Sequence, residues 1–308
     1  MKKFFALLML LAAIPAALAI PPKSCRVITD TIHSRLLGTE RVFTVCLPPG
    51  YDKDKHLSYP VLYLLHGLGG THDDWQKHAN VSLVASLMAS SGEADPMIIV
   101  MPDAGGADPD EQQNGYFDMP AWPYEKFFFE EFLPEVEKRY RVIGDRRHRA
   151  IAGLSMGGGG SVAYAQHHPE FFSSVYAMSA WLRLRDPNWS NAPKDSPRDK
   201  LYRAVTANDC LAFLQNADSA TLEPLRKIDW MIDCGDDDFL LDRNVEFYGK
   251  MRDLRLPCQL RVRDGYHNWA YWYECLRTLL PFVSRSFAGK GQSSLSDYYT
   301  TNIHTSLL

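Results

Sequence analysis

Short apolar runs alternate with amphipathic stretches along most of this 308-residue chain. Apolar runs that end in small or polar residues are typical of buried strands, and the segments at 124–140 and 244–255 have helical spacing. Strands that alternate with helices predict a mainly parallel, twisted α/β sheet with helices on both faces. The predicted strands cover residues 59–67, 96–104, 149–155, 172–180, 228–235 and 257–265.

Residues 25–48 differ from this rhythm, because two extended segments flank the sequence LLGTE and predict an antiparallel hairpin. No internal repeat or low-complexity linker divides the chain, so residues 20–288 are interpreted as one domain. Residues 182–227 are rich in proline, asparagine and charge, and we expect them to form an insertion over the edge of the sheet with one short helix at 209–216. Residues 289–308 form a polar C-terminal tail.

The first nineteen residues have the pattern of a secretory signal peptide. Lys2 and Lys3 precede an apolar stretch, and Ala17 and Ala19 form an A-x-A cleavage pattern. The alternative is a membrane anchor, but the apolar core is shorter than the roughly 20 residues that a bilayer span needs. The sequence therefore predicts a signal peptide at 1–19 and a secreted or periplasmic protein with no membrane span after cleavage.

The amino-acid composition limits the kinds of partner that the protein is expected to bind. The chain is 46% hydrophobic and 23% charged with a formal charge of −4, which is ordinary for a globular domain. It has no long run of lysine or arginine, so nucleic acid is not an expected partner. Six cysteines could form disulfides after export, but the sequence does not select a pairing, and the absence of a C-x-x-C pair argues against a zinc site.

The strongest chemical signal is the sequence GLSMG at 153–157. Ser155 follows an apolar strand and precedes a helix rich in small residues, which is the context of a nucleophile elbow. Gly153 and Gly157 would let the strand and the helix approach each other closely. The alternative is a glycine-rich turn with no catalytic role, whereas a phosphate-binding loop would need a Lys-Ser or Lys-Thr pair that is missing.

A serine nucleophile needs a histidine base, which follows it in the chain order of α/β-hydrolases. His167 and His168 lie about 18 Å further along the helix that Ser155 begins, too far to reach it. His304 lies in the polar tail. This leaves His267, in the loop after the last predicted strand, where open parallel sheets place their sites.

The acid that orients the histidine should follow the preceding strand. The sequence CGDDDFLLD supplies several carboxylates there, and at most one of them need be catalytic. The residue pattern alone does not choose among Asp236, Asp237, Asp238 and Asp242.

An oxyanion hole needs two backbone N–H groups, one of them directly after the nucleophile. Met156 supplies the first, and Leu68, in the glycine-rich loop after an earlier strand, is the candidate for the second. His66 in the same loop is interpreted as structural, because it precedes Ser155 in the chain.

Four motifs, LLHGLGGTHDDW, AGLSMGG, IDCGDDDF and GYHNWAYW, together resemble the Putative esterase family of α/β-hydrolases. This family includes esterase D, feruloyl esterases, acetyl esterases and mycolyltransferases, and the resemblance covers about residues 25–287 with the motifs in family order. It implies an α/β-hydrolase fold and a serine hydrolase that needs no metal or cofactor. The family's C-G-x-x-D pattern implies Asp238 as the acid, beside Ser155 as nucleophile, His267 as base, and Leu68 and Met156 as amide donors.

An exported member of this family with tryptophans near the site resembles enzymes that release feruloyl or acetyl groups from xylan. Trp181 and Trp269 are candidates for substrate binding, Trp189 lies in the same region, and Trp272 is expected to pack the C-terminal helix. The expected partner is an acylated carbohydrate or a small ester. The alternatives are a general short-chain carboxylesterase, a thioesterase like S-formylglutathione hydrolase, an acyltransferase to a sugar, or a non-catalytic carbohydrate-binding protein. The last would be expected to have a broken triad.

Overall fold

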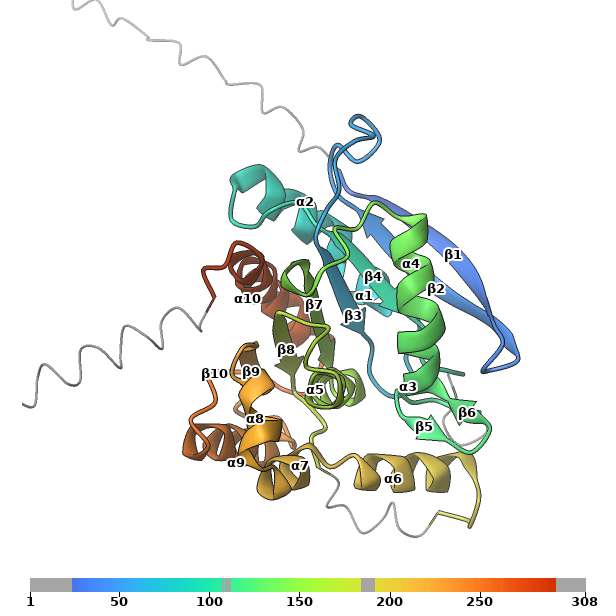
Figure 1. Ribbon diagram of the computed structural model, residues 1–308, viewed down its shortest axis with the longest axis vertical. Helices are drawn as coiled ribbons and strands as arrows, with labels where there is room; N and C mark the ends of the chain where they lie inside the picture. Colours follow the sequence, from blue (N-terminus) through green and yellow to red (C-terminus); the bar gives the residue numbers. More distant parts are fainter. Residues whose placement is uncertain (1–23, 107, 109–111, 184–191, 292–308) are drawn as a thin grey trace, which may run out of the picture.

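The computed structural model describes residues 24–106, 108, 112–183 and 192–291 (Figure 1). The predicted signal peptide at 1–19, Trp189, His304 and most of the polar tail lie outside the described residues.

Eight strands form one sheet in the order β1-β2-β4-β3-β7-β8-β9-β10. Neighbouring strands from β4 to β10 in this order are parallel, and the central ones are apolar along their whole length because helices bury both sides of them. The predicted α/β fold with a mainly parallel sheet is confirmed. The central and far-edge strands are β3 (Val61–Leu65), β4 (Ile98–Pro102), β7 (Arg149–Leu154), β8 (Ser174–Met178), β9 (Asp229–Gly235) and β10 (Cys258–Arg263).

The other edge of the sheet is the predicted hairpin. β1 (Arg26–Ser34) and β2 (Thr39–Leu47) pair antiparallel, and β2 pairs antiparallel with β4. Gly38, with φ of 66°, lies in the turn, in the left-handed region that glycine enters without a Cβ clash. A separate two-stranded ribbon is formed by β5 (Asp118–Met119) and β6 (Trp122–Pro123).

Helices cover both faces of the sheet, so there is one apolar core on each side (Figure 1). On one face α10 (Trp269–Phe287) packs against α1 (Asp74–Ala79) and α2 (Val81–Ser91). On the other face α5 (Met156–His167) lies over β7 and β8, and α9 (Leu241–Asp253) covers β9 and β10. A 3₁₀ turn at Arg146–His148 leads into β7.

The helix predicted at 124–140 is continuous but not uniform. It runs as α3 (Tyr124–Phe127), a π-helical turn at Phe128–Phe132, and α4 (Leu133–Arg139). Pro134 has no N–H to donate to the preceding turn, which favours the wider hydrogen-bond spacing just before it. The π turn places a cluster of phenylalanine rings against the sheet.

The segment at 182–227 contains more helix than the sequence led us to expect. Its described part holds α6 (Pro197–Ala207), α7 (Cys210–Asn216) and α8 (Ser219–Leu225), of which only α7 was predicted. The side chains of Ser196, Asp209 and Asp218 each accept a backbone N–H of the first helical turn. α7 packs between α5 and α9, and α6 reaches the β5–β6 ribbon (Figure 1).

All six cysteines lie in the described part of the chain as free thiols, and the side chains of Cys25 and Cys46 lie close to each other, beside the start of β1 and the end of β2. Among the described helices, none combines the length and the apolar character that a membrane span requires.

Candidate active site

Ser155 occupies a sharp turn between β7 and α5. Its backbone has φ of 52° and ψ of −116°, a conformation that residues with a Cβ rarely adopt and that costs about 1–3 kcal/mol. The neighbouring glycines make the turn sterically feasible. A Cβ on Gly153 would collide with the carbonyl of Gly157, and a Cβ on Gly157 would collide with the carbonyl oxygen of His66. The turn therefore projects the Ser155 side chain from the carboxyl edge of the sheet.

The remaining glycines of the run at 157–160 serve the packing of α5, whose residues from Met156 to Gln166 are all buried. A Cβ on Gly158 would lie 2.9 Å from the Cβ of Ala180, and a Cβ on Gly159 would collide with the carbonyl oxygen of Trp181. A Cβ on Gly160 would lie 3.1 Å from the ring of Tyr116. Each glycine thus removes a clash with a different neighbour.

His267 lies within hydrogen-bond distance of both Ser155 and Asp238. Its Nε2 is 3.0 Å from the Ser155 Oγ, and its Nδ1 is 2.9 and 3.1 Å from the two carboxylate oxygens of Asp238. With the proton on Nδ1, the imidazole donates a hydrogen bond to Asp238 and accepts one from the hydroxyl of Ser155 on Nε2. The His267 side chain is 19% exposed, whereas that of Asp238 is fully buried. The structure therefore brings together the three side chains that the sequence analysis singled out.

The loops that follow β9 and β10 position Asp238 and His267. Asp238 follows β9, and its Oδ1 accepts the backbone N–H of Leu240 at 2.8 Å. His267 follows β10, and the side chain of Asn268 caps α10 by accepting the N–H of Tyr271 at 3.1 Å. Both loops lie at the carboxyl ends of neighbouring parallel strands, which meet at the same edge of the sheet.

Asp238 is held in its charged form. Burial alone raises the pKa of this carboxyl, but hydrogen bonds from His267, the hydroxyl of Ser179 and the N–H of Leu240 outweigh burial and lower the pKa below its usual value. A charged carboxylate next to Nδ1 stabilises the imidazolium that forms when His267 accepts a proton.

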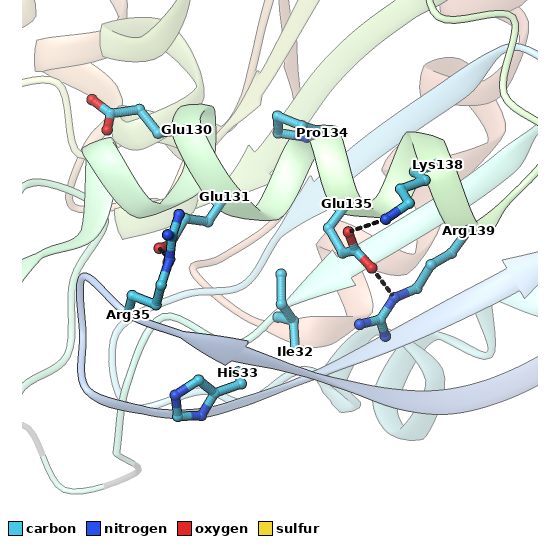
Figure 2. A pocket seen from close by; sticks show the side chains of 9 residues that line it. All are labelled: Ile32, His33, Arg35, Glu130, Glu131, Pro134, Glu135, Lys138 and Arg139. Carbon is cyan, nitrogen blue, oxygen red and sulfur yellow. Dashed lines mark hydrogen bonds and ion pairs between the residues drawn. The ribbon is translucent and has the colours of Figure 1, made fainter.

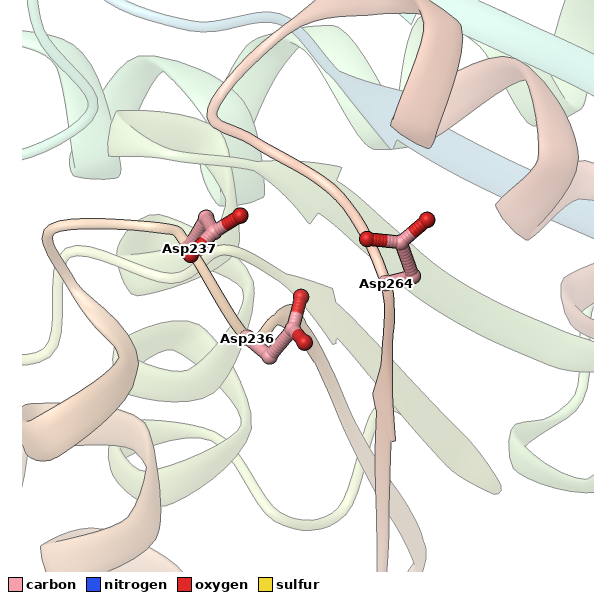
Figure 3. A group of neighbouring side chains, drawn as sticks. All are labelled: Asp236, Asp237 and Asp264. Carbon is pink, nitrogen blue, oxygen red and sulfur yellow. The ribbon is translucent and has the colours of Figure 1, made fainter.

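The neighbouring aspartates have different surroundings. The carboxylates of Asp236, Asp237 and Asp264 gather at the exposed ends of β9 and β10, within 4.8 Å of one another (Figure 3). Three such oxygens could share a cation, but all three residues are solvent-exposed, and Asp236 already accepts the N–H of Gly265 at 2.9 Å. Asp242 lies in the first turn of α9.

The loop after β3 lies directly beside the nucleophile. A Cβ on Gly67 would lie 3.6 Å from the Cβ of Ser155, and Gly69 has φ of 69°. In the described part of the chain, the backbone N–H groups of Leu68 and Met156 donate to no protein acceptor. Met156 is the first residue of α5, whose N-terminal N–H groups are free to bind a negative charge.

Histidines other than His267 are engaged elsewhere. His167 and His168, at the end of α5, both hydrogen bond to Glu125. His66 is buried and hydrogen bonds to backbone groups on both sides of its ring. These contacts agree with the expectation that none of the three serves Ser155 as a base.

The tryptophans differ in what they contact. The backbone N–H of Trp181 donates to the carbonyl oxygen of Ser155 at 2.9 Å, which places this residue at the nucleophile turn. Trp269 stacks on His78 with ring centroids 4.9 Å apart, and its ring meets Trp75 and Trp272 edge-on. Trp272 is buried in the core under α10, as expected.

Two aromatic side chains that the sequence analysis did not single out flank His267. Phe239 is 70% exposed and Tyr266 is 61% exposed, the two highest values among the large hydrophobic side chains of the described residues. The ring centroids of Phe239 and His267 are 4.6 Å apart. In the sequence Phe239 is next to Asp238 and Tyr266 is next to His267, and this proximity was the available signal. The exposure of the two rings could not be deduced from the residue pattern.

One groove of the described surface lies away from this site. It has a volume of about 400 Å³ between β1 and α4 (Figure 2). Several of its charged side chains pair with one another, as in the contacts of Glu135 with Lys138 and Arg139 and of Arg35 with Glu131. It contains none of the residues around Ser155.

A family model described as Putative esterase matches residues 34–283. The chain belongs to this family. The resemblance deduced from the four motifs is therefore confirmed, and the family and its relatives support a serine hydrolase that acts on ester bonds.

Known relatives include feruloyl esterases. The structure of a ferulic acid esterase is 50% identical, with a TM-score of 0.83, and the match covers 86% of this chain and 99% of that one. An endo-1,4-beta-xylanase/feruloyl esterase of Xylanibacter ruminicola is 33% identical over 46% of this chain and 20% of its own length. An S-formylglutathione hydrolase of Staphylococcus aureus, 21% identical with a TM-score of 0.69 over 84% of this chain and 99% of that one, shares the fold. The chain spans between a fifth and a third of the length of the first curated relatives.

Proposed function

We propose that this chain is a serine carboxylesterase that hydrolyses acyl esters through a covalent acyl-enzyme. The observation that carries the proposal is the unbroken hydrogen-bond chain from the Ser155 hydroxyl through His267 to the buried Asp238 carboxylate. Distances of 3.0 and 2.9 Å are those over which a base takes a proton from a nucleophile and is itself oriented by an acid.

In the first step the Ser155 Oγ attacks the ester carbonyl while its proton moves to Nε2 of His267. Asp238 keeps the proton on Nδ1 and stabilises the imidazolium. When the tetrahedral intermediate collapses, the imidazolium gives its proton to the leaving alcohol oxygen. The products of this step are the free alcohol and an ester between the acyl group and Ser155.

In the second step the same groups act on water. His267 accepts a proton from the water molecule that attacks the acyl-enzyme, and then returns that proton to the Oγ of Ser155. The carboxylic acid leaves and the enzyme regains its starting state. A sugar hydroxyl in place of water would give acyl transfer instead of hydrolysis.

The negative charge on the carbonyl oxygen develops next to the N–H groups of Leu68 and Met156. Neither group donates to an acceptor in the described part of the chain, and both belong to the segments that meet at Ser155. Donors of this kind are already oriented before the reaction, and removal of one such donor costs other serine hydrolases about 10²–10³ in rate.

We propose that the substrates are feruloyl or acetyl esters carried by a plant polysaccharide such as xylan. A ferulic acid esterase at 50% identity supports the acyl group, and a relative named as both xylanase and feruloyl esterase supports the polysaccharide. The exposed rings of Phe239 and Tyr266 beside His267 offer flat apolar faces on which a phenolic acid or a sugar could stack. Trp181 and Trp269 remain predicted contacts of the same substrate.

The proposal includes export, on the strength of the predicted signal peptide and A-x-A pattern at residues 17–19. Expression of the full chain with N-terminal sequencing of the exported product tests it. A mature N-terminus at Ile20 is expected, and retention of Lys2 and Lys3 in a cell-bound product would contradict export.

Rates on methyl ferulate, acetylated xylan, p-nitrophenyl acetate and S-formylglutathione test the substrate class. We expect methyl ferulate or acetylated xylan to give the highest kcat/KM, whereas a preference for S-formylglutathione would refute the plant-wall assignment. Ser155→Ala should abolish turnover of every ester while its thermal unfolding remains cooperative. Full activity in this variant would refute Ser155 as the nucleophile. A labelled xylo-oligosaccharide acceptor, analysed by mass spectrometry, separates transfer from hydrolysis.

A further inference from the structure

Ser179, the residue directly after β8, lies beneath the proposed triad. It is fully buried and has φ of 45°, in the left-handed region that residues with a Cβ seldom occupy. Its backbone N–H donates to the carbonyl oxygen of Asp233 on β9 at 2.8 Å, so its position between the two strands is fixed. The contacts of its hydroxyl indicate the role of this strained, buried serine.

The hydroxyl has a donor on one side and a carboxylate on the other. The indole Nε1–H of Trp272 donates to the Ser179 Oγ at 3.0 Å. Because the oxygen accepts this bond, its own hydrogen is free to be donated, and the carboxylate of Asp238 lies within its reach. The contacts thus run from Trp272 through Ser179 to the proposed triad acid.

Cys234 on β9 also lies within reach of this hydroxyl. Burial raises the pKa of the Cys234 thiol, so this group stays neutral, and a neutral sulfur is a weak acceptor beside a charged carboxylate. The hydroxyl hydrogen of Ser179 therefore goes to Asp238. The titratable side chains that the described contacts bring against this part of the site are Asp238, His267 and Cys234.

The same tryptophan also contacts the base. The ring of Trp272 meets the imidazole of His267 at a centroid distance of 5.0 Å and an interplanar angle of 87°. Trp272, Ser179, Asp238 and His267 therefore form a closed ring of contacts. The backbone continues the connection, since Trp181, two residues after Ser179, donates to the carbonyl oxygen of Ser155.

We propose that Ser179 is a positioning residue for the esterase reaction, whose hydroxyl, held by Trp272, fixes the orientation of the Asp238 carboxylate against His267. The inference rests on the proposed function, because it assigns a role only if Asp238 and His267 act together.

The geometry gives the reason. The Asp238 carboxylate can rotate about the bond that joins it to its Cβ, and the N–H of Leu240 fixes only Oδ1. The hydroxyl of Ser179 adds a second donor from the residue that follows β8, in a different segment from the loop that carries Asp238 and Leu240. Partners of this kind, which do not touch the substrate, orient the groups that do.

The test compares Ser179→Ala with Ser174→Ala. Ser174, the first residue of β8, is equally buried, but its hydroxyl has no hydrogen-bond partner among the described residues, so it is a matched control. For Ser179→Ala we expect kcat on p-nitrophenyl acetate to fall about ten- to hundredfold, the range for loss of a hydrogen bond to a charged group. KM should change less than about twofold. Ser174→Ala should retain the wild-type kcat.

A pH profile separates positioning from a loss of folded protein. Without the Ser179 donor the pKa of Asp238 rises, so the low-pH fall in kcat/KM should begin at higher pH in Ser179→Ala than in the wild type. A smaller folded fraction would lower the whole profile without moving it. Trp272→Phe removes the indole N–H but keeps a ring, and should shift the profile in the same direction by less.

The outcomes distinguish this proposal from the proposed function. If Ser155→Ala is inactive but Ser179→Ala keeps the wild-type kcat and pH profile, the positioning role is wrong and the triad stands. If Ser155→Ala remains active, both are wrong. If Ser179→Ala does not fold, Trp272→Phe decides, and an unchanged profile in that variant overturns the proposal.

Discussion

His66 accepts the backbone N–H of Ala104 on its Nε2 at a distance of 2.9 Å. Its Nδ1 side donates to the carbonyl oxygen of Gly67 at 2.7 Å. Both ring nitrogens are therefore used by the neutral imidazole, and a second proton on Nε2 would break the bond to Ala104. Burial lowers the pKa of His66, more than the contact with Gly67 raises it. This histidine ties the loop that carries Leu68 to the end of β4.

The stability of the protein should therefore fall as the pH drops below about 6.5, the ordinary pKa of histidine. In the unfolded chain His66 binds a proton there, whereas in the folded chain it does not, so the unfolded state is stabilised relative to the folded state as the pH falls. The contribution is at most about 1.4 kcal/mol per pH unit. Urea unfolding at pH 7.5 and 5.5 measures it. His66→Gln should be less stable at pH 7.5 but lose less on acidification, and equal losses in both proteins would contradict the prediction.

Gly157→Ala should destabilise the protein by about 2 kcal/mol or more, because the added methyl group meets backbone carbonyls of His66 and Leu65 that cannot move aside. Gly249→Ala in α9 is the control, since its Cβ would meet nothing within 4 Å. It should stabilise the helix by about 0.5–1 kcal/mol. Denaturant midpoints measure both changes, and a destabilised Gly249→Ala with an unchanged Gly157→Ala would contradict the packing argument.

Glu137 and Arg149 form a buried ion pair beneath the start of β7, through contacts of 2.7 and 2.9 Å. Their side chains are 15% and 7% exposed. Glu137→Gln should cost about 3 kcal/mol of unfolding free energy, because it leaves the guanidinium buried with a weaker partner. Asp52→Asn, which breaks the exposed pair with Arg26, should cost less than about 1 kcal/mol. Thermal unfolding in low and high salt checks both, and a similar cost for the two variants would argue against burial as the cause.

Phe239→Ala should raise KM for methyl ferulate several-fold while leaving KM for methyl acetate nearly unchanged. The ring is 70% exposed, so its removal takes away a surface for an aromatic acyl group at little cost in stability. Trp269→Ala is the contrast, because its ring packs against His78, Trp75 and Trp272 and its loss should lower the melting temperature. Equal effects of Phe239→Ala on both esters would show that this ring does not select the acyl group.

Much of the fold could be predicted because its signals are local. The buried strands appear as apolar runs, and the turn at Ser155 appears as glycines around a serine between a strand and a helix. The flanking helices α6 and α8 were missed although Ser196 and Asp218 are good N-caps, since the polar composition of this segment concealed the caps. The π turn before Pro134 was missed because a helical spacing does not reveal a change in hydrogen-bond pattern.

The same division between residues with a local sequence signal and residues without one holds for the site. Chain order and spacing selected His267, but choosing Asp238 from its neighbours required the resemblance to a family, because three consecutive aspartates have the same local pattern. The contact of Ser179 with Asp238 and Trp272 joins three separate segments of the chain, and no periodicity in any of them indicates it. Exposure of Phe239 likewise depends on which elements leave its ring uncovered.

The burial of α5 from Met156 to Gln166 limits how such an enzyme can diversify. A helix with no solvent-exposed face tolerates few substitutions, because each of its residues already packs against the sheet or against an adjoining helix. New ester preferences must therefore arise in the loops around the nucleophile, at positions such as Phe239 and Tyr266. Libraries for altering specificity should vary those loops and leave the helix unchanged.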